Sequence, residues 1–457
     1  MDVRPTTGGH VVAVPYPGRS HVNAMLNLCK LLLSNNSHIL LTFVLTEEWL
    51  ALIGDSKPHN IRFLTIPNVI PSEHGRANDF AAFFEAVMTK MEAPFERLLN
   101  QLQPPPTVII YDTFMFWVVR VANRSNIPVA SFWPMSASVF AVFKHYRLLH
   151  QNGHYPVNVS EDGEKRVDYI PGNSSIRLAD FPLNDESWRT RKILELVLNV
   201  LPWVHKAQYL LFATVYELEP RAIEALKAEF SIPIYTVCPT IPYCSNDHID
   251  ASKDDYFEWL DKQPSGSVLY ISQGSFLSVS NAQRDEIAIG VRESGVRFMW
   301  VQPGESDRLK ELCGDRGLVL AWCDQIRVLQ HPAIGGFWSH CGWNSTREGV
   351  FSGVPFLAFP IYVDQPLNGK LIAEEWKVGW RVKRDVKNDT LIARDEIASL
   401  VKKFMDVDDD EMRDMRKRSI ELKQLCQHAI APGGSSETDM NAFLSHVLQG
   451  VNPNKSK

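Results

Sequence analysis

Short apolar runs alternate along the chain with longer segments in which apolar residues recur at the spacing of a helix. The first unit predicts a strand over His10–Pro15, a turn over Tyr16–His21 and a helix over Asn23–Leu33. Strands that alternate with helices in this way are typical of parallel sheets covered by helices. The pattern therefore predicts an α/β fold.

A similar unit begins again in the second half, with a strand over Ser267–Ser272, a turn over Gln273–Ser275 and a helix over Ala282–Ser294. Further strands are predicted at Ile39–Leu45, Ile61–Thr65, Thr107–Tyr111, Val129–Trp133, Phe298–Gln302, Gly317–Ala321, Ile334–Ser339, Pro355–Phe359 and Trp380–Val382. The chain is therefore expected to form two doubly wound α/β halves. Ligands of open α/β sheets bind beyond the carboxyl ends of the strands, so two facing halves would hold a site in the cleft between them.

Prolines and a polar run interrupt the pattern between Tyr235 and Lys262. We expect a first domain over residues 1–240, a linker over residues 241–262, a second domain over residues 263–435 and a terminal helix over residues 436–457. The terminal segment repeats apolar residues at helical spacing and should bury one face. No Gly-x-Gly-x-x-Gly follows any predicted strand, which disfavours a dinucleotide-dependent oxidoreductase.

The composition is that of an ordinary globular protein, with 45% apolar and 22% charged residues among 457, and excludes a disordered or low-complexity chain. The formal net charge is −6, so binding to nucleic acid through a basic surface is not expected. The longest apolar run, Ile193–Trp203, contains Glu195 and Pro202 and is shorter than the roughly 18 residues of a membrane span. We therefore expect no integral membrane contact.

Seven cysteines are scattered without the spacing of metal ligands, which favours a reducing compartment. The first residues, Met1–His10, are polar and lack the apolar core of a signal peptide. These features favour a soluble cytoplasmic protein, and we expect a monomer.

The most distinctive chemistry falls between Trp322 and Gln365. A predicted strand ends at His340–Gly342, and a helix is expected to begin near Trp343. Free backbone N–H groups and the helix dipole favour an anion at such a turn, so it is a candidate site for a diphosphate. A polar residue there, Asn344 for example, could instead only cap the helix.

Other residues of this stretch would complete a nucleotide-sugar site. Trp322 follows a predicted strand and could stack on a flat base, and Glu348 lies one turn into the helix, where a carboxylate could accept both hydroxyls of a ribose. Asp364 and Gln365 follow the next strand and could bind sugar hydroxyls. Base, ribose, diphosphate and sugar would then each have a partner.

At these positions the sequence resembles the plant secondary product glycosyltransferase box, the signature of plant family 1 UDP-sugar glycosyltransferases. The matching residues are Trp322, Gln325, His331, Gly336, Phe337, His340, Cys341, Gly342, Trp343, Asn344, Ser345, Glu348, Gly353, Val354, Pro355, Pro360, Asp364 and Gln365. The resemblance extends over nearly the whole chain, through His10–His21, Tyr111–Phe114, Tyr216–Pro220 and Tyr270–Ser275. It implies the GT-B fold, with two Rossmann-like domains that face a central cleft, the first binding the acceptor and the second the UDP-sugar.

The resemblance also assigns roles in donor binding. Trp322 would stack on uracil, Gln325 would lie at the base and ribose, and Glu348 would hold the ribose hydroxyls. His340, Asn344, Ser345 and Ser275 would hold the diphosphate, while Trp343, Asp364 and Gln365 would contact the transferred sugar. Cys323 and Gly342 complete the expected donor set. The tryptophan at 343 with the terminal glutamine resembles the glucose-using version of the box.

His21 and Asp112 are the candidate catalytic pair. Each follows a predicted strand of the first half, although a lone histidine among 14 is more often a surface or core residue. By the resemblance, His21 is the general base that removes the acceptor proton, and Asp112 orients and charges it. The family commonly has Gly and Pro where this chain has Ser20 and Ala24, and more often Phe at Gln273, so the turn at His21 departs from the family's pattern.

Aromatic residues of the first half could line an acceptor pocket. The candidates are Phe114, Trp117, Trp133 and Phe140, although aromatics at such positions are more often plain core. The acidic run Asp406–Glu411 contains an Asp-x-Asp like that of metal-dependent GT-A transferases. It lies between helical segments rather than after a strand, which favours a solvated linker, so no metal site is expected.

We therefore expect an inverting UDP-glycosyltransferase that moves a hexose, with glucose favoured, to a hydroxyl or carboxyl of a small lipophilic acceptor such as a phenolic, terpenoid or hormone. UDP-glucose would be a co-substrate, and no cofactor or metal would be required. One alternative is a non-catalytic nucleotide-sugar-binding protein, which the intact His21 and Asp112 disfavour. Another is a thiol hydrolase built on Cys341 beside His340, disfavoured because adjacent residues at a strand end point to opposite faces.

Overall fold

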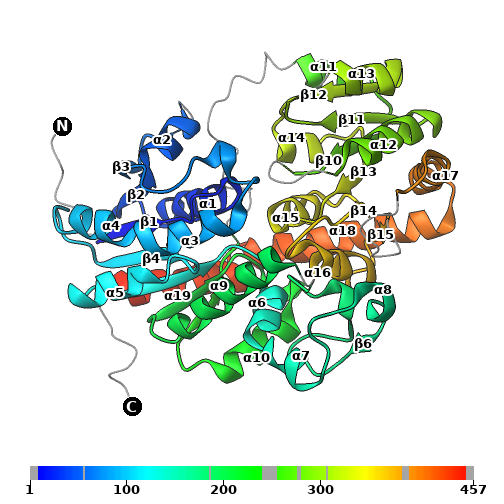
Figure 1. The fold of residues 1–457 in the computed structure, drawn as a ribbon. Coiled ribbons are helices and arrows are strands. Elements are labelled where there is room, and N and C mark those ends of the chain that lie inside the picture. Colours follow the sequence, from blue (N-terminus) through cyan, green and yellow to red (C-terminus); the bar gives the residue numbers. More distant parts are fainter. Residues whose placement is uncertain are drawn as a thin grey trace.

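The computed structural model describes residues 9–54, 57–184, 187–238, 255–274, 279–304, 307–382 and 391–448. Two parallel sheets organise them into two lobes (Figure 1). The first sheet has the order β3-β2-β1-β4-β5-β8-β9 and the second β12-β11-β10-β13-β14-β15. The two doubly wound halves predicted from the sequence are confirmed.

The strands of the first sheet are β1 (His10–Val14), β2 (Leu40–Thr46), β3 (Arg62–Ile66), β4 (Val108–Asp112), β5 (Val129–Trp133), β8 (Tyr209–Phe212) and β9 (Ile234–Thr236). Those of the second are β10 (Val268–Ser272), β11 (Arg297–Val301), β12 (Gly317–Leu320), β13 (Ile334–Ser339), β14 (Phe356–Ala358) and β15 (Gly379–Arg381). A short antiparallel hairpin joins β6 (Arg166–Val167) and β7 (Ile176–Arg177). The sequence pattern did not include β8 and β9, because four and three residues are too few to establish a period.

Helices cover both faces of each sheet. In the first lobe they are α1 (Arg19–Asn35), α2 (Glu47–Ile53), α3 (Phe80–Lys90), α4 (Glu92–Leu99), α5 (Trp117–Arg124), α6 (Ala137–Lys144), α7 (Arg147–Gln151), α8 (Val159–Asp162), α9 (Trp188–Val204) and α10 (Pro220–Glu229). Those that follow are α11 (Asp255–Asp261), α12 (Asn281–Glu293), α13 (Asp307–Cys313), α14 (Gln325–Leu329), α15 (Trp343–Ser352), α16 (Gln365–Lys370), the π-helix η7 (Leu371–Glu375), α17 (Arg394–Met405), α18 (Asp410–Ile430) and α19 (Ser435–Leu448). The described residues also form the 3₁₀ turns η1 (Glu73–Gly75), η2 (Leu178–Asp180), η3 (Tyr216–Leu218) and η6 (Gly314–Arg316).

Burial on both faces explains why the strands are nearly all apolar. In β1, Val12 and Val14 belong to one core cluster, while Val11 and Ala13 belong to the cluster on the opposite face. Successive side chains of a strand point to opposite faces, so a strand covered on both sides needs apolar residues throughout. The first helix starts earlier than the sequence pattern predicted. Gly18 is its N-cap in an extended conformation, which places His21 in the first helical turn rather than in a loop.

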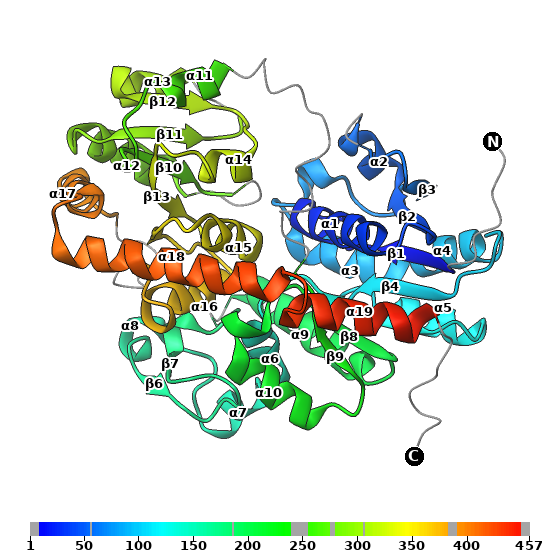
Figure 2. The same ribbon diagram turned by 180° about the vertical axis from the view of Figure 1, so that it is seen from behind.

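The last helix returns to the first lobe. Figure 2 shows α18 and α19 crossing the back of the molecule from the second sheet to the first. Met440, Phe443, Leu444 and Val447 of α19 are buried in the same cluster as β1. The carboxylate of Asp439 also accepts hydrogen bonds from the backbone N–H and hydroxyl of the β9 strand end, at Thr236 (2.7 Å each). The chain that carries the second sheet thus ends packed on the first.

Ion pairs also tie the lobes together. Arg381 of β15 makes two hydrogen bonds, of 2.8 and 3.0 Å, to the carboxylate of Asp180, which is 1% exposed. Arg166 makes a similar pair of 3.0 Å bonds to Glu374. Within the described residues no helix is long and apolar enough to cross a membrane.

Candidate active site

Each sheet reverses its strand order at one point, and the two points lie at the candidate site. In the first sheet the reversal falls between β1 and β4, and in the second between β10 and β13. Chain that leaves the carboxyl ends of two such strands in opposite directions opens a crevice, where ligands of α/β proteins bind. The predicted catalytic residues follow β1 and β4, and the predicted diphosphate turn follows β13.

The structure brings the predicted catalytic pair together. Nδ1 of His21 lies 2.7 Å from Oδ2 of Asp112, and the Asp112 side chain is fully buried while that of His21 is 16% exposed. The other carboxylate oxygen accepts a hydrogen bond from the backbone N–H of Phe114 at 3.1 Å. Because Nδ1 faces a carboxylate, it carries the ring hydrogen and leaves Nε2 as the acceptor. The imidazole is thus arranged to receive a proton.

Aromatic rings surround the imidazole. The ring centroids of Tyr16 and Phe114 lie 5.0 and 5.9 Å from that of His21, and Phe84 packs edge-on against Phe114 at 5.1 Å. Sequence reasoning missed Tyr16 and Phe84. Tyr16 stands just after the end of β1, where residues of a parallel sheet enter a binding site, so its position in the sequence could have indicated it. Phe84 lies within α3, and its sequence pattern does not distinguish it from a core residue.

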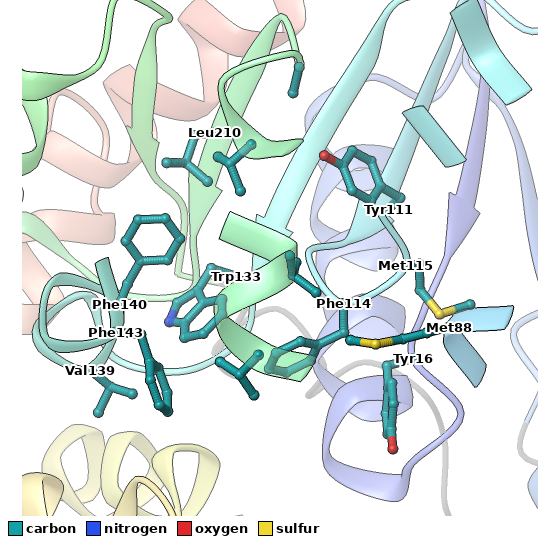
Figure 3. Packing of buried hydrophobic residues seen from close by; sticks show 14 of the residues in the cluster. Tyr16, Met88, Tyr111, Phe114, Met115, Trp133, Val139, Phe140, Phe143 and Leu210 are labelled. Atoms are coloured by element: carbon teal, nitrogen blue, oxygen red, sulfur yellow. The ribbon is translucent and has the colours of Figure 1, made fainter. Parts of the chain in front are cut away.

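The predicted acceptor aromatics divide into two groups. Phe114 is the one that touches His21, whereas Trp117, Trp133 and Phe140 are 0% exposed in the core of the first lobe. Figure 3 shows Phe114, Trp133 and Phe140 in that core. The Trp133 ring packs on both neighbours, at centroid distances of 5.5 and 5.0 Å. The Trp117 indole donates instead to the carbonyl of Val87 (3.1 Å), so these three rings support the wall behind Phe114.

The turn from β13 into α15 has the geometry of an anion site. Gly342 is the N-cap and has no side chain with which to cap the helix, and the side chain of Asn344 bonds to Ser20 and Arg347 instead, so among the described residues the alternative of a merely capping Asn344 does not hold. The N–H groups of the first helical turn therefore remain available to a ligand. A methyl group at Gly274 or Gly342 would lie 2.9 or 2.4 Å from Nε2 of His340, so the two glycines make room for this imidazole. Burial lowers the pKa of His340 to about 4, and its ring is neutral near pH 7.

Gln325 connects the residues predicted to bind base and ribose. Its side-chain amide donates to the hydroxyl of Ser345 at 2.9 Å and to the carboxylate of Glu348 at 2.5 Å. Burial raises the pKa of Glu348 to about 7. Trp322 is 69% exposed, which suits a surface on which a flat base stacks. Cys323 is 5% exposed and lies behind it, with its sulfur 3.4 Å from the hydroxyl of Tyr270.

The residues predicted to bind the sugar lie at the start of α16. Oε1 of Gln365 accepts hydrogen bonds from the backbone N–H groups of Ile361 (2.8 Å) and Tyr362 (2.9 Å), which leaves its amide N–H groups for a ligand. Burial raises the pKa of Asp364 to about 6, although the hydrogen bond from Asn368 and the nearby imidazole of His21 both act to lower it. The carboxylate predicted to bind the sugar and the candidate base therefore lie close enough to interact electrostatically.

Two residues of α15 reach the first lobe. The side-chain amide of Asn344 donates to the carbonyl of Ser20 at 2.9 Å, next to His21. The indole N–H of Trp343 donates to the carbonyl of Ala213 at 2.7 Å, and the side chain is 3% exposed. The helix that would hold the diphosphate is thus joined directly to the turn that carries the base. Ser275, also predicted to bind the diphosphate, lies outside the described residues.

The structure disfavours the thiol hydrolase. Burial raises the pKa of the Cys341 thiol to about 12, and its sulfur lies 3.5 Å from the carbonyl of Ser339. A reactive cysteine needs its thiolate, which this site does not supply. Among the residues that the structure describes, no group of three or more His, Cys, Asp or Glu side chains could hold a metal ion.

Comparisons with known proteins find relatives over nearly the whole chain. The model of the UDP-glucoronosyl and UDP-glucosyl transferase family matches residues 196–406. The chain is 51% identical over 443 residues to UDP-glycosyltransferase 87A1 of Arabidopsis thaliana, covering 96% of this chain and 100% of that protein.

Solved structures of full-length relatives share the fold. The structure of Phytolacca americana UGT2 complexed with UDP-2fluoro-glucose and pterostilbene is similar with a TM-score of 0.79 and 28% identity, over 96% of this chain and 99% of that chain. Medicago truncatula UGT71G1 complexed with UDP-glucose gives a TM-score of 0.79 and 26% identity, over 97% and 99%. These similarities extend through both lobes and the cleft between them.

Proposed function

The chain belongs to the UDP-glucoronosyl and UDP-glucosyl transferase family, and from that premise we propose that it is an inverting enzyme that uses UDP-glucose. As a member it is a UDP-dependent glycosyltransferase of GT-B fold that acts on small molecules. The proposal adds the transferred sugar, glucose, and the chemical route. It also adds the acceptor group, a hydroxyl or carboxyl of a lipophilic compound such as a phenolic, terpenoid or hormone.

One observation carries the proposal: the buried Asp112 holds His21 at 2.7 Å, next to the Ser20 carbonyl that Asn344 of α15 contacts. An acceptor hydroxyl is a poor nucleophile until a base removes its proton, and a positioned imidazole contributes about 10²- to 10⁴-fold to such a reaction. The carboxylate stabilises the imidazolium that forms. Base and donor helix are held in register by the bond from Asn344 to Ser20.

The transfer then proceeds in one displacement. Nε2 of His21 takes the proton of the acceptor hydroxyl as the oxygen attacks the anomeric carbon of glucose. The bond between that carbon and the diphosphate oxygen breaks, and UDP leaves with the electron pair. Attack from the face opposite UDP inverts the anomeric configuration. The N–H groups of α15 and the neutral ring of His340 stabilise the negative charge that develops on the diphosphate.

The donor site supports glucose as the transferred sugar. The amide N–H groups of Gln365 can donate to hydroxyls of a hexose, and the carboxylate of Asp364 can accept from neighbouring hydroxyls. An epimer of glucose would leave one of these two side chains without its hydrogen-bond partner, and enzymes strongly reject substrate analogues that do so. The UDP-glucose and UDP-2fluoro-glucose complexes of the two similar structures support the same donor.

The surroundings of His21 support a flat or apolar acceptor. Tyr16, Phe84 and Phe114 present ring edges and faces next to the imidazole, and aromatic rings favour offset or edge-on contact with other rings. The similar Phytolacca americana structure contains pterostilbene, which supports a lipophilic acceptor here. The same chemistry serves a carboxyl acceptor, which is already ionised near neutral pH and needs less help from the base.

We also propose that the enzyme is a cytoplasmic monomer that requires no metal or other cofactor. The described cysteines, at positions 29, 238, 313, 323, 341 and 426, are all buried thiols, which fits a reducing compartment. The positive end of α15 supplies the stabilisation that a metal ion gives in other transferases.

The test of the base is His21→Ala. We expect kcat toward a hydroxyl acceptor to fall by at least about a hundredfold, while the Kd for UDP, measured by calorimetry, stays near the wild-type value because no diphosphate contact is lost. The double variant with Asp112→Ala should be little worse than His21→Ala, because residues that act as a unit are not additive. Transfer to an alcohol at the wild-type rate, or a parallel loss of UDP affinity, would overturn the assignment.

A further inference from the structure

Asn368 is a buried amide in the second turn of the donor-site helix α16. Its side chain is 0% exposed, and its Nδ2 donates to the carbonyl oxygen of Cys341 (2.9 Å) and to Oδ2 of Asp364 (2.8 Å). A carboxamide nitrogen has two hydrogens, and here each faces an acceptor. The reverse orientation would place the amide oxygen against two other oxygens, so the network fixes the assignment.

The two acceptors belong to different parts of the donor site. Cys341 lies between His340 and Gly342 in the diphosphate turn and has a φ of +64°, a left-handed conformation that costs energy in a residue with a side chain. Asp364 is the carboxylate proposed to bind the transferred sugar. One side chain therefore joins the turn beside the diphosphate to the carboxylate beside the sugar.

The remaining atom of the amide indicates that the position is not optimised for stability alone. Oδ1 of Asn368 is buried and has no hydrogen-bond partner among the described residues. An unpaired buried carbonyl costs about 1–3 kcal/mol, which an apolar residue of similar size would avoid. The contribution of this side chain to the site therefore comes from its two N–H donors.

We propose that Asn368 is a positioning residue for donor-sugar recognition, because it fixes the carboxylate of Asp364 relative to the diphosphate turn. The inference rests on the proposed assignment of Asp364 to the transferred sugar. Without the amide, the carboxylate keeps only the hydrogen bond with its own backbone, and its alignment with the sugar hydroxyls is weakened. Within the described residues, Asn368 makes no hydrogen bond to Trp322, Glu348 or the α15 N–H groups. It reaches the diphosphate turn only through the carbonyl of Cys341, so binding of the nucleotide part should depend on it much less.

The test compares UDP with UDP-glucose in Asn368→Ala. Loss of a hydrogen bond to a charged group corresponds to about tenfold or more. We expect the KM for UDP-glucose to rise about tenfold, and the preference for UDP-glucose over UDP-galactose in kcat/KM to fall by at least as much. The Kd for UDP should change less than about threefold. Asn368→Asp keeps the side-chain shape but sets a second carboxyl against Asp364, and it should change the donor preference in the same direction.

Gln283 provides the matched control, because it is a buried carboxamide of α12 in the same lobe. Its amide donates to the carbonyl of Ile392 (3.1 Å) and accepts from the backbone N–H of the same residue (2.8 Å). It makes no side-chain hydrogen bond to the described donor-site residues named above. Gln283→Ala should lower the melting temperature and leave the donor preference unchanged. A loss of stability alone therefore cannot imitate the expected result.

The outcomes separate this inference from the function on which it rests. If Asp364→Ala leaves the donor preference unchanged, the proposed sugar site is wrong. If Asp364→Ala lowers the preference and both Asn368 variants retain it, the positioning role alone is wrong. Equal losses of UDP and UDP-glucose affinity in the Asn368 variants would also overturn it. In support, Asn368→Ala should add little to the loss of preference in an Asp364→Ala background, because it acts through that carboxylate.

Discussion

The ionised carboxylate of Glu348, which is partly buried, should lower the free energy of unfolding of the ligand-free enzyme. Burial raises the pKa of Glu348 from 4.5 to about 7. An acid with a raised pKa in the folded state binds its proton more tightly there than in the unfolded chain. Below about pH 4.5 both states are protonated and no penalty arises, whereas above about pH 7 the folded state must hold the ionised carboxylate.

The size of this penalty follows from the shift. A difference of about 2.5 pKa units at about 1.4 kcal/mol per unit gives roughly 3 kcal/mol at high pH, of which more than about 2 kcal/mol develops between pH 5 and pH 8. Glu348→Gln removes the charge and keeps an oxygen that can accept from Gln325. The free energy of unfolding of this variant should therefore exceed that of wild type by about 2 kcal/mol more at pH 8 than at pH 5.

Urea denaturation of the ligand-free protein at the two pH values measures this difference. Glu258→Gln, at an exposed position of α11, reports any effect of exchanging a carboxylate for an amide at the surface. The same Glu348→Gln protein should bind UDP more weakly, because an amide accepts less strongly than a carboxylate from the two ribose hydroxyls. A stability difference that is equal at both pH values, or opposite in sign, would refute the reasoning.

Three further predictions concern other parts of the site and fold. Gly342→Ala should weaken UDP binding by about tenfold, because the added methyl would lie 2.4 Å from the His340 ring; calorimetry that finds unchanged affinity would contradict this. Deleting residues from 436 onward exposes the surface that α19 covers, where burying each of its apolar side chains contributes about 1.5–3 kcal/mol, so the melting temperature and the activity should both fall. Activity should persist after dialysis against excess EDTA, and a loss restored by Mn²⁺ or Mg²⁺ would show that a metal takes part.

The sequence predicted the architecture well because apolar residues recur along it in the patterns of strands and helices. Strands such as Val129–Trp133 are buried on both faces and are therefore nearly all apolar, and helical patterns alternate with them along the chain. The positions of His21, Asp112 and the His340–Gly342 turn also followed, because residues after parallel strands gather at one edge of a sheet. Their distances and hydrogen bonds needed the structure.

Other features could not be read from the pattern. Trp133 ends a strand of the first lobe and Phe114 follows another, yet only Phe114 reaches His21. In a sheet that helices cover on both faces, a buried aromatic and an aromatic that faces the cleft have the same sequence pattern. Asp364 and Asn368 have the i, i+4 spacing of a helical pair, but the other partner of Asn368 is 27 residues away, and no spacing rule links those two residues. Contacts between the lobes, such as Arg381 with Asp180, depend on how two independently folded sheets dock.

The crossing of α19 sets a limit on how this enzyme can be recombined. Acceptor and donor halves of the site sit on different sheets, so exchanging whole lobes between relatives is an obvious route to new combinations of acceptor and sugar. A single crossover between the lobes would, however, leave a foreign α19 on the first sheet, opposite Thr236 and the β1 core. A working chimera should therefore have two junctions, with the terminal helix inherited together with the first lobe that it covers.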